Sequence, residues 1–471
     1  MLPSTSFRAL AVFSLFGTSI SHAETITACR KGCDHTSINA AIDASKDGDI
    51  IELSAEIYTE GSVINPDGKA VTIRGVLDES GRPASVLDGG DRHQVLTCLS
   101  GETPDTVIEN VMIRNGRTGD AYRNDRGAGM LNLNSSPTLR NCTFTDNTAT
   151  DHGGGMANYE SHPMLIDCVF MRNRAGFYGG GVFNRSSSPT LKGCTFAENT
   201  AESSGGGMFN GFGSHPELTD CTFDRNTGDH SSGVGMFNCH SSPILHGCEF
   251  TQNRSGGTGG GSGVGMMNIH SHAKIVKCVF AGNSSAFQGE GGAVANRYGE
   301  PRFEDCTFEG NSIDSYGFGG GMFNHHSRPT LDRCTFTSNS AYNGIGGGMC
   351  NRNSGTLMRD CTFEVNWAEV GGAVSNSTKI DGRILTPDDD PTLIGCTMTG
   401  NWCDLGSGGV ETSTPNPSLD FGPCVPRMTA CRLWCNSPVS MDDPFEDGGD
   451  NCIRDDCIEC PETGAGNGAP Q

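Results

Sequence analysis

A sequence repeat runs from Met130 to Asn401 and, more than any other feature, limits what this chain can fold into. Each copy, of about 27 residues, contains a glycine-rich bend, an apolar residue, an Asn, a short turn, a Leu segment, a Cys-x-Phe step and a second Asn. Self-similarity at such a period is typical of a solenoid, because each repeat buries its apolar face only by stacking on its neighbours. The Cys-x-Phe step begins at Cys142, Cys168, Cys194, Cys221, Cys248, Cys278, Cys306, Cys334 and Cys361, and a last copy at Cys396 has Met398 in the Phe place.

The pattern within each repeat favours strands over helices. Segments such as Cys194-Thr195-Phe196 are short and alternate, and no stretch keeps an apolar 3.6-residue period over the length of a helix. Gly-Gly-Gly and Ser-Ser-Pro recur through the repeats, and such residues break helices and make corners. We therefore predict an all-β protein: a single right-handed parallel β-helix solenoid with three short strands per turn.

Residues at the same place in successive repeats form columns with uniform chemistry. The place after the glycines is always Met or Val, from Met130 to Val374. Two residues later comes an unbroken Asn column from Asn132 to Asn376, and a second Asn column follows the Phe residues. We predict that the Met/Val, Phe and Cys columns lie inside the rod. The Asn columns should lie at corners and bond from turn to turn, which is a structural role.

Phe170-Met171-Arg172-Asn173, paired with Gly291-Gly292-Ala293-Val294, resembles the repeat of the polymorphic outer-membrane protein family. That resemblance covers the ten regular copies and implies a β-helix displayed outside the cell, often with an adhesive role. The chain departs from the family because it has no C-terminal run of alternating ten-residue strands that could form a membrane barrel. We do not expect it to anchor itself in an outer membrane.

The N-terminal part resembles the broader group of pectin-lyase-like secreted β-helices. Residues 36–46 have the pattern of a short amphipathic helix with a polar cap at Thr36 or Ser37, which would cover the open first turn. Irregular turns are expected over residues 49–116 and regular repeats over 127–402, so the β-helix domain is predicted at 24–402. Residues 403–471 would form a Cys-rich, acidic C-terminal cap and a disordered tail.

Residues 1–23 have the features of a secretory signal peptide. Arg8 precedes an apolar run, and Ser21-His22-Ala23 supplies a cleavage site. The run is too short to span a bilayer, and no later segment reaches eighteen apolar residues. We expect the mature chain to be secreted or held at the cell surface, with no membrane-spanning segment.

The 22 cysteines divide into two groups with different expected chemistry. The ten cysteines of the repeat column are expected to be buried free thiols, because parallel side chains on stacked turns give poor disulfide torsion. Six others crowd the acidic C-terminal segment, where disulfides would staple a cap with little core of its own. A zinc site is the alternative there. The six are Cys424, Cys431, Cys435, Cys452, Cys457 and Cys460.

The formal net charge of -23 excludes nucleic acid as the expected partner, because no basic excess is present to neutralise phosphates. It also opposes binding of polyanionic glycans unless local cations or Ca²⁺ intervene. Asp388, Asp389 and Asp390, in the longest insertion of the repeat region, are a candidate Ca²⁺ site or a loop that is merely solvated. No other cofactor is indicated.

Two neighbouring columns after the first Asn column form the candidate ligand-binding strip. One column reads His240, His270, Tyr298 and His326, and the other reads Arg297, His325 and Arg352. Side chains of these types, one turn apart, could hold a sugar chain along the rod through stacking and through bonds to carboxylate or sulfate. Protonation of the histidines would strengthen binding of anionic glycans. An ordinary solvated turn is the alternative, and a metal bound by these histidines is a weaker one.

A second candidate surface is an apolar stripe between the Met/Val and Asn columns. Its members are Phe183, Phe209, Phe237 and Met267 on consecutive turns, and strict alternation predicts that they point outward. An exposed apolar stripe of this size usually marks an interaction surface. The alternative is that segments 202–206 or 255–263 fold over it.

Pectin-degrading enzymes of this fold resemble one another in carrying motifs such as Asn-Thr-Asp and Gly-His-Gly. The chain lacks these motifs, and its sequence assigns no catalytic residue. The regular repeats favour a non-catalytic protein that binds glycans or another surface macromolecule. The alternatives are a polysaccharide lyase or hydrolase acting on acidic polysaccharide, and a purely structural envelope rod.

Overall fold

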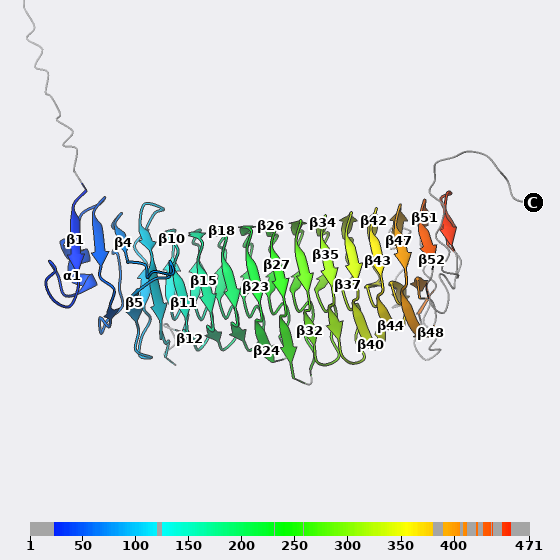
Figure 1. Ribbon diagram of the computed structural model, residues 1–471, viewed down its shortest axis with the longest axis horizontal. Helices are drawn as coiled ribbons and strands as arrows, with labels where there is room; N and C mark the ends of the chain where they lie inside the picture. The colour runs from blue at the N-terminus through cyan, green and yellow to red at the C-terminus, as the bar shows by residue number, and fades with distance from the viewer. Residues whose placement is uncertain are drawn as a thin grey trace, which may run out of the picture.

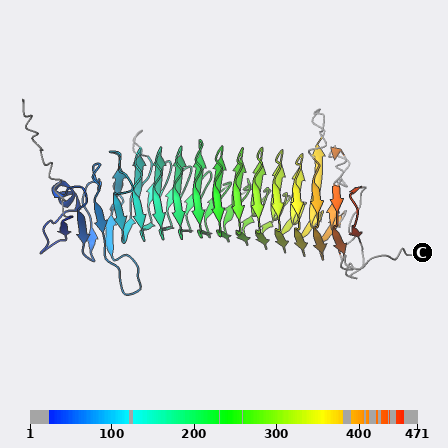
Figure 2. The ribbon, with the colours of Figure 1, turned by 90° about the horizontal axis from the view of Figure 1, so that it is seen from above.

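The structure is a computed structural model that describes residues 23–119, 125–229, 231–257, 259–379, 390–405, 408–411, 421–422, 427–434, 436 and 445–453. The chain forms a straight rod in which parallel strands stack turn upon turn from one end to the other (Figure 1, Figure 2). Four sheets of 16, 15, 13 and 10 strands run along the rod, and we call them sheets 1, 2, 3 and 4 in that order. The predicted β-helix is confirmed.

A single turn visits all four sheets. In one regular turn, β17 (Val182–Arg185) lies in sheet 3, β18 (Thr190–Lys192) in sheet 1, β19 (Thr195–Ala197) in sheet 2 and β20 (Thr200–Ala201) in sheet 4. Each strand pairs in parallel with its counterpart one turn away, so equivalent residues of the repeat lie in register. The prediction of three strands per turn was wrong, because the fourth strand has too few residues to show a pattern.

The core consists of the predicted columns. The Phe rings are fully buried and stack face to face along the rod, as between Phe223 and Phe250, whose ring centroids are 4.6 Å apart. The Met/Val column and the Cys column are also buried, beside a Leu-rich column from sheet 1. Stacking of like residues keeps every apolar side chain in contact with a neighbour of the same shape, which gives the density expected of a protein interior.

The two Asn columns form buried hydrogen-bonded ladders. In the second column, the Asn226 side-chain oxygen accepts hydrogen bonds from the backbone N–H and the side-chain amide of Asn199, at 3.0 and 3.1 Å. The Asn226 amide donates to the backbone oxygen of Phe196 and to the side-chain oxygen of Asn253, both at 2.9 Å. Each amide of the second column therefore satisfies buried backbone groups and links three turns, which confirms the predicted structural role. The predicted corner position was wrong for the first column, which lies within the strands of sheet 3, as Asn184 does in β17, and bonds from amide to amide.

Replacement of Asn226 by Ala should destabilise the rod. It leaves the backbone N–H of Asn199 without its hydrogen-bond partner, at about 1–3 kcal/mol for a buried group left unsatisfied, and it removes the side-chain donor to the Phe196 carbonyl. Thermal and urea unfolding should show the loss. Lys192→Ala, on the exposed face of sheet 1, is the control and should leave stability within about 0.5 kcal/mol of wild type. Equal stability of the Asn226 variant and wild type would contradict the ladder's role.

The rod is longer than predicted at its C-terminal end, and at its N-terminal end strand pairing begins before the irregular turns predicted from residue 49. Strand β1 (Thr25–Ala28) precedes the helix and pairs with β2 (Ile50–Leu53), so pairing begins well before residue 49. Beyond residue 402, β51 (Arg427–Thr429) and β52 (Arg432–Trp434) continue sheets 1 and 2, followed by β53 (Glu446–Asp447) and β54 (Cys452–Ile453). The segment after 402 therefore contains further turns, and the predicted signal residues 1–22 lie outside the described residues.

The described residues hold a single helix, α1 (Ile38–Ala44), near the N-terminal end of the rod (Figure 1). Its cap residue is Ser37, whose side chain accepts a hydrogen bond from the backbone N–H of Ala40 at 3.2 Å. Ile38 and Ile42 are buried in the main core. The helix contacts β1 and β2, and its role as a cap stays a prediction.

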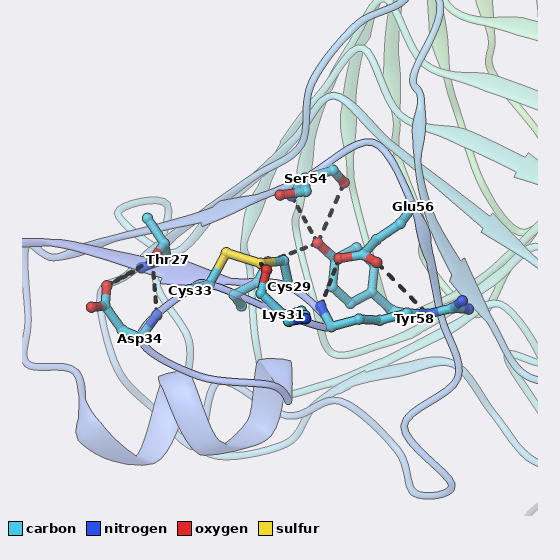
Figure 3. The surroundings of a disulfide bond; sticks show 10 residues. Thr27, Cys29, Lys31, Cys33, Asp34, Ser54, Glu56 and Tyr58 are labelled. Atoms are coloured by element: carbon cyan, nitrogen blue, oxygen red, sulfur yellow. Dashed lines mark hydrogen bonds and ion pairs between the residues drawn. A yellow bond between two sulfur atoms is a disulfide. The ribbon is translucent and has the colours of Figure 1, made fainter.

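A disulfide that was not predicted joins Cys29 to Cys33 just after β1 (Figure 3). The Tyr58 hydroxyl lies beside it, donates to the Ala28 carbonyl at 2.7 Å and accepts from the Ser54 N–H at 2.7 Å. Burial raises the pKa of Tyr58 to about 12, so the hydroxyl stays protonated and keeps both bonds. The disulfide closes a short loop within the first turn and links no two turns.

The cysteine column is free of disulfides throughout, as predicted, and burial raises the pKa of the Cys168 thiol well above its ordinary value. One expectation for the C-terminal group was wrong: Cys431 is a buried free thiol that extends the column by one turn beyond Cys396. Cys452 is disulfide-bonded. Cys424, Cys435, Cys457 and Cys460 lie outside the described residues.

Cys194, Cys221 and Cys248 should react with iodoacetamide only after the rod is unfolded, because they are fully buried and the reagent cannot reach them. Mass spectrometry of native and denatured protein, alkylated without reductant, measures this directly. A disulfide-linked peptide joining two members of the column would contradict the structure. The peptide containing Cys29 and Cys33 should stay unmodified until reductant is added.

Candidate functional site

The predicted apolar stripe is not exposed, and this expectation was wrong. Phe183, Phe209 and Met267 are buried, and Phe237 is half-buried. His152 and Tyr178, which lie just before the glycine bends of two turns, fold back over the start of the stripe. The His152 ring stacks on Phe183 at 4.5 Å between centroids, and the Tyr178 ring stacks on Phe209 at 4.6 Å. The stripe is therefore part of an accessory core, and its first members are covered by rings from the preceding turns.

His152 is a titratable residue that packs against this accessory core. Its ring is stacked between Tyr178 and Phe183, and its Nδ1 lies 3.3 Å from a carboxylate oxygen of Asp151. Burial lowers the pKa of His152 below the ordinary value of 6.5, and the opposing attraction of Asp151 does not reverse that shift. The neutral ring is the form that the fold stabilises.

Acidification below about pH 6.5 should therefore destabilise the protein through His152. The unfolded chain takes up a proton on this residue at a higher pH than the folded chain does, so stability from this group is complete above the unfolded value and falls as the pH drops below it. Unfolding free energies measured from pH 7.5 to 5 should fall less steeply in His152→Phe than in wild type. His246→Ala, at an exposed histidine, is the control. Identical slopes in wild type and His152→Phe would contradict this explanation.

The first predicted column is assembled into a continuous stack of rings on one corner of the rod. We call His240, His270, Tyr298 and His326 the ring ladder. Successive ring centroids are 4.7, 5.0 and 5.6 Å apart, with interplanar angles of 9°, 15° and 7°. The four residues directly follow β25 (Met236–Cys239), β29 (Met266–Ile269), β33 (Val294–Arg297) and β37 (Met322–His325), all in sheet 3.

The backbone of this corner is left-handed, with φ between 48° and 56° at the four ring residues. The same corner is occupied by Asn134 and Asn353 at other turns, and Asn is a residue that tolerates this conformation well. Because Asn serves the corner elsewhere, the backbone does not require bulky rings at four consecutive turns. The rings therefore supply chemistry that the fold itself does not need.

The stacking decides which part of each ring a ligand can reach. Face-to-face contact uses both faces of the inner rings, so the ladder offers ring edges to solvent rather than faces. Those edges carry the imidazole nitrogens and the Tyr298 hydroxyl, which donate and accept hydrogen bonds. The expected stacking of sugars on these rings is thus restricted to the ends of the ladder, and hydrogen bonding is the chemistry available along it.

The ring ladder borders a shallow groove of about 390 Å³, which we call the ladder groove. His272, Glu300, Arg328 and Asn353 also line it, and the sequence did not single them out. His272 and Arg328 lie on the turn that leads into sheet 1. They belong to one column of the repeat, in which the residue varies among Ser, His, Glu and Arg. Only their position two residues after the ring ladder could have indicated them. The complete lining is His270, His272, Tyr298, Gly299, Glu300, His326, Arg328 and Asn353.

The second predicted column does not line the ladder groove. Arg297 pairs with Glu290, and the Arg352 guanidinium lies 5.9 Å from the centroid of the Phe318 ring, so both contact the column that covers the accessory core. His325 lies between the two regions, with its ring 4.4 Å from that of His326. Arg297, His325 and Arg352 are in register on consecutive turns. The cation that the groove contains is Arg328.

The candidate Ca²⁺ site is not described, because Asp388 and Asp389 lie outside the described residues and only Asp390 is placed. Among the described residues, no group of three or more His, Cys, Asp or Glu side chains is arranged to hold a metal ion. Within that same part of the chain, no helix is long and apolar enough to cross a membrane.

A sequence profile described as right handed beta helix region matches residues 98–259 and 209–383, which together cover more than half of the chain. No curated protein sequence matches the chain.

Several solved structures resemble the rod at low identity. The A-module of the mannuronan C-5 epimerase AlgE6 from Azotobacter vinelandii is 11% identical with a TM-score of 0.34, covering 89% of this chain and 94% of that chain. The catalytic domain of a GH87 α-1,3-glucanase in complex with nigerose is 11% identical with a TM-score of 0.27, covering 91% and 69%. Tailspike protein 3 of bacteriophage CBA120 is 11% identical with a TM-score of 0.29, covering 91% and 59%. Likeness at this level carries no argument about what this chain binds or catalyses.

Proposed function

Because the chain belongs to the family of right-handed β-helix proteins, with a rigid ladder of polar ring edges on one corner, we propose that it is a non-catalytic glycan-binding rod. The ligand is an extended sugar chain that lies along the ladder groove. The protein acts outside the cell, where surface glycans are available. The repeat of the polymorphic outer-membrane type and its adhesive role belong to the same proposal.

The single observation that carries the proposal is the ring ladder beside its groove. Four polar rings on successive turns hold their hydrogen-bonding edges in a straight line, and the stack fixes each ring before any ligand arrives. A site that is already ordered loses little side-chain entropy when it binds. Sugar hydroxyls, arranged at regular intervals along a chain, are suitable partners for such a line of donors and acceptors.

The charges of the groove favour a neutral or sparsely acidic glycan at neutral pH. Arg328 is a cation and Glu300 is an anion, so their charges offset each other within the same lining. The net charge of -23 repels densely charged polyanions over the rest of the surface. Protonation of the histidines adds positive charge to the groove and should strengthen binding of acidic sugars.

The Cys29–Cys33 disulfide supports the extracellular part of the proposal, because disulfides persist in oxidising compartments and are rare in the cytosol. The predicted signal peptide at residues 1–23 agrees with it. Cells that express the full chain should release or display a mature protein starting after Ala23, which N-terminal sequencing of the exported product measures. Retention of residues 1–23 on a cytosolic product would contradict export.

A double substitution, His270→Ala with Tyr298→Ala, should lower the affinity for the bound glycan about tenfold or more. It removes the middle of the ring ladder and its hydrogen-bonding edges, with each lost bond contributing about 0.5–1.5 kcal/mol. An array of neutral and acidic oligosaccharides identifies the ligand, and titration calorimetry measures the affinity.

Ser186→Ala, at the same corner four turns before Tyr298 on the rod axis and outside the groove, is the matched control and should bind like wild type. Arg328→Ala should weaken binding, whereas Arg297→Ala should not, because Arg297 faces Glu290. Unchanged affinity in the double variant would overturn the site. Release of shorter or unsaturated sugars from any polymer would overturn the non-catalytic part and favour a lyase or hydrolase.

A further inference from the structure

Sheet 4 carries a second, larger groove on a different face of the rod, which we call the sheet 4 groove. It is formed over β16 (Arg174–Ala175), β20, β24 (Thr227–Asp229) and β28 (Arg254–Gly256) and has a volume of about 640 Å³. A second hollow of about 480 Å³ adjoins it and shares Arg174 and Glu202. Volumes of this size are those of ordinary small-molecule and oligosaccharide sites.

The sheet 4 groove is hollow because one column of the repeat carries glycine at two of its turns. Glu202 and Asp229 occupy this column on adjacent turns, and glycines, Gly176 and Gly256, stand on the turns before and after them. A Cβ atom at Gly256 would lie 2.8 Å from a carboxylate oxygen of Asp229, so a side chain there would displace that carboxylate. The column therefore presents two carboxylates between two open positions.

The neighbouring column supplies cations and hydroxyls. It reads Arg174, Thr200, Thr227 and Arg254 in register on four consecutive turns. The hydroxyls of Thr200 and Thr227 are 2.9 Å apart and bond to each other, which holds both side chains in place while leaving each oxygen able to accept another hydrogen bond. Over four turns spaced about 4.8 Å apart, this column is about 14 Å long.

The two arginines differ in what they already bind. An Nη atom of Arg174 lies 2.7 Å from a carboxylate oxygen of Glu202, so its charge is neutralised within the groove. Arg254 and Asp229 are both exposed, and neither has an ion-pair partner within the described part of the chain. The groove therefore contains one guanidinium and one carboxylate that are available to a ligand, beside a pair of ordered hydroxyls.

From this arrangement we propose that the sheet 4 groove is a second oligosaccharide-binding site, which takes a largely neutral sugar chain with a single acidic sugar seated at Arg254. A guanidinium forms paired, charge-assisted hydrogen bonds with a carboxylate. Asp229, Glu202 and the two threonines accept hydrogen bonds from sugar hydroxyls. A second acidic sugar in the groove would lie against Asp229 or Glu202 and be repelled, which limits the ligand to sparse charge.

The exposed Phe177 side chain, which lines the adjoining hollow, offers a ring face at one end of the groove. Unlike the rings of the ring ladder, it makes no face-to-face contact, because its ring has only tilted or edge contacts with His152 and Tyr178. A ring face that no other ring covers can stack on the apolar face of a sugar. The sheet 4 groove thus combines stacking at one end with an ionic contact at the other.

The test uses the full secreted chain and three probes: a xylo-oligosaccharide carrying one glucuronic acid, the same chain without that acid, and an oligogalacturonate of equal length. Wild type should bind the singly acidic probe most tightly by titration calorimetry. Arg254→Ala should lower that affinity about tenfold and remove the preference over the neutral probe, while Arg254→Lys should keep part of it. Asp229→Asn should improve binding of the oligogalacturonate. Arg302→Ala is the matched control: it removes an exposed arginine on sheet 1, away from the sheet 4 groove, and should leave the affinity for all three probes unchanged.

The ladder variant His270→Ala with Tyr298→Ala separates this proposal from the proposed function. If binding of the singly acidic probe survives in the ladder variant and falls in Arg254→Ala, the sheet 4 groove is the site. If it survives in Arg254→Ala and falls only in the ladder variant, the sheet 4 proposal is overturned and the ladder groove stands. Equal affinity of wild type for the singly acidic and neutral probes would also overturn it.

Discussion

The structure depends on the in-register stacking of identical side chains from one turn to the next. Parallel pairing places equivalent residues of the repeat directly above one another, so one favourable contact is repeated along the whole rod. For the Phe column this contact is ring on ring. For both Asn columns it is amide on amide, and in the second column each amide also satisfies backbone groups. An Asn ladder of this kind tolerates no change of register, because a shift would leave a row of buried amides unpaired.

Much of the fold could be predicted because each position of the repeat lies in the same environment in all ten copies. A position that is Phe or Cys in nearly every copy must serve the same packing role, and the burial of Phe223 and Cys194 follows from that uniformity. The failures occurred where uniformity is absent. The stripe containing Phe183 was expected to face solvent because alternation alone describes only one strand. Its cover comes from His152 and Tyr178, in a column of mixed residues, and no periodic signal reveals that they fold back.

The same contrast holds for the candidate sites. The ring ladder was visible in the sequence because His240, His270, Tyr298 and His326 stand at one place of the repeat. The geometry still changed its interpretation. Stacking uses the ring faces, and Arg297 and Arg352 contact Glu290 and Phe318 and do not line the groove. The sheet 4 groove was not predictable. Its strands have two or three residues, and its columns mix Thr, Arg, Glu, Asp and Gly, so only the paired turns bring Arg254 and Asp229 together.

The disulfide near β1 lies within one turn, and the cysteines of the core column remain free thiols, so no described covalent bond ties one regular turn to the next. Under a pulling force on the two ends of the rod, each regular turn is held in place only by its noncovalent contacts with the neighbouring turns. Tension would strip the turns singly from an end, and each event would release a length of about one repeat. The remainder would stay intact, which gives the molecule a way to lengthen under load without losing the sites on its remaining turns.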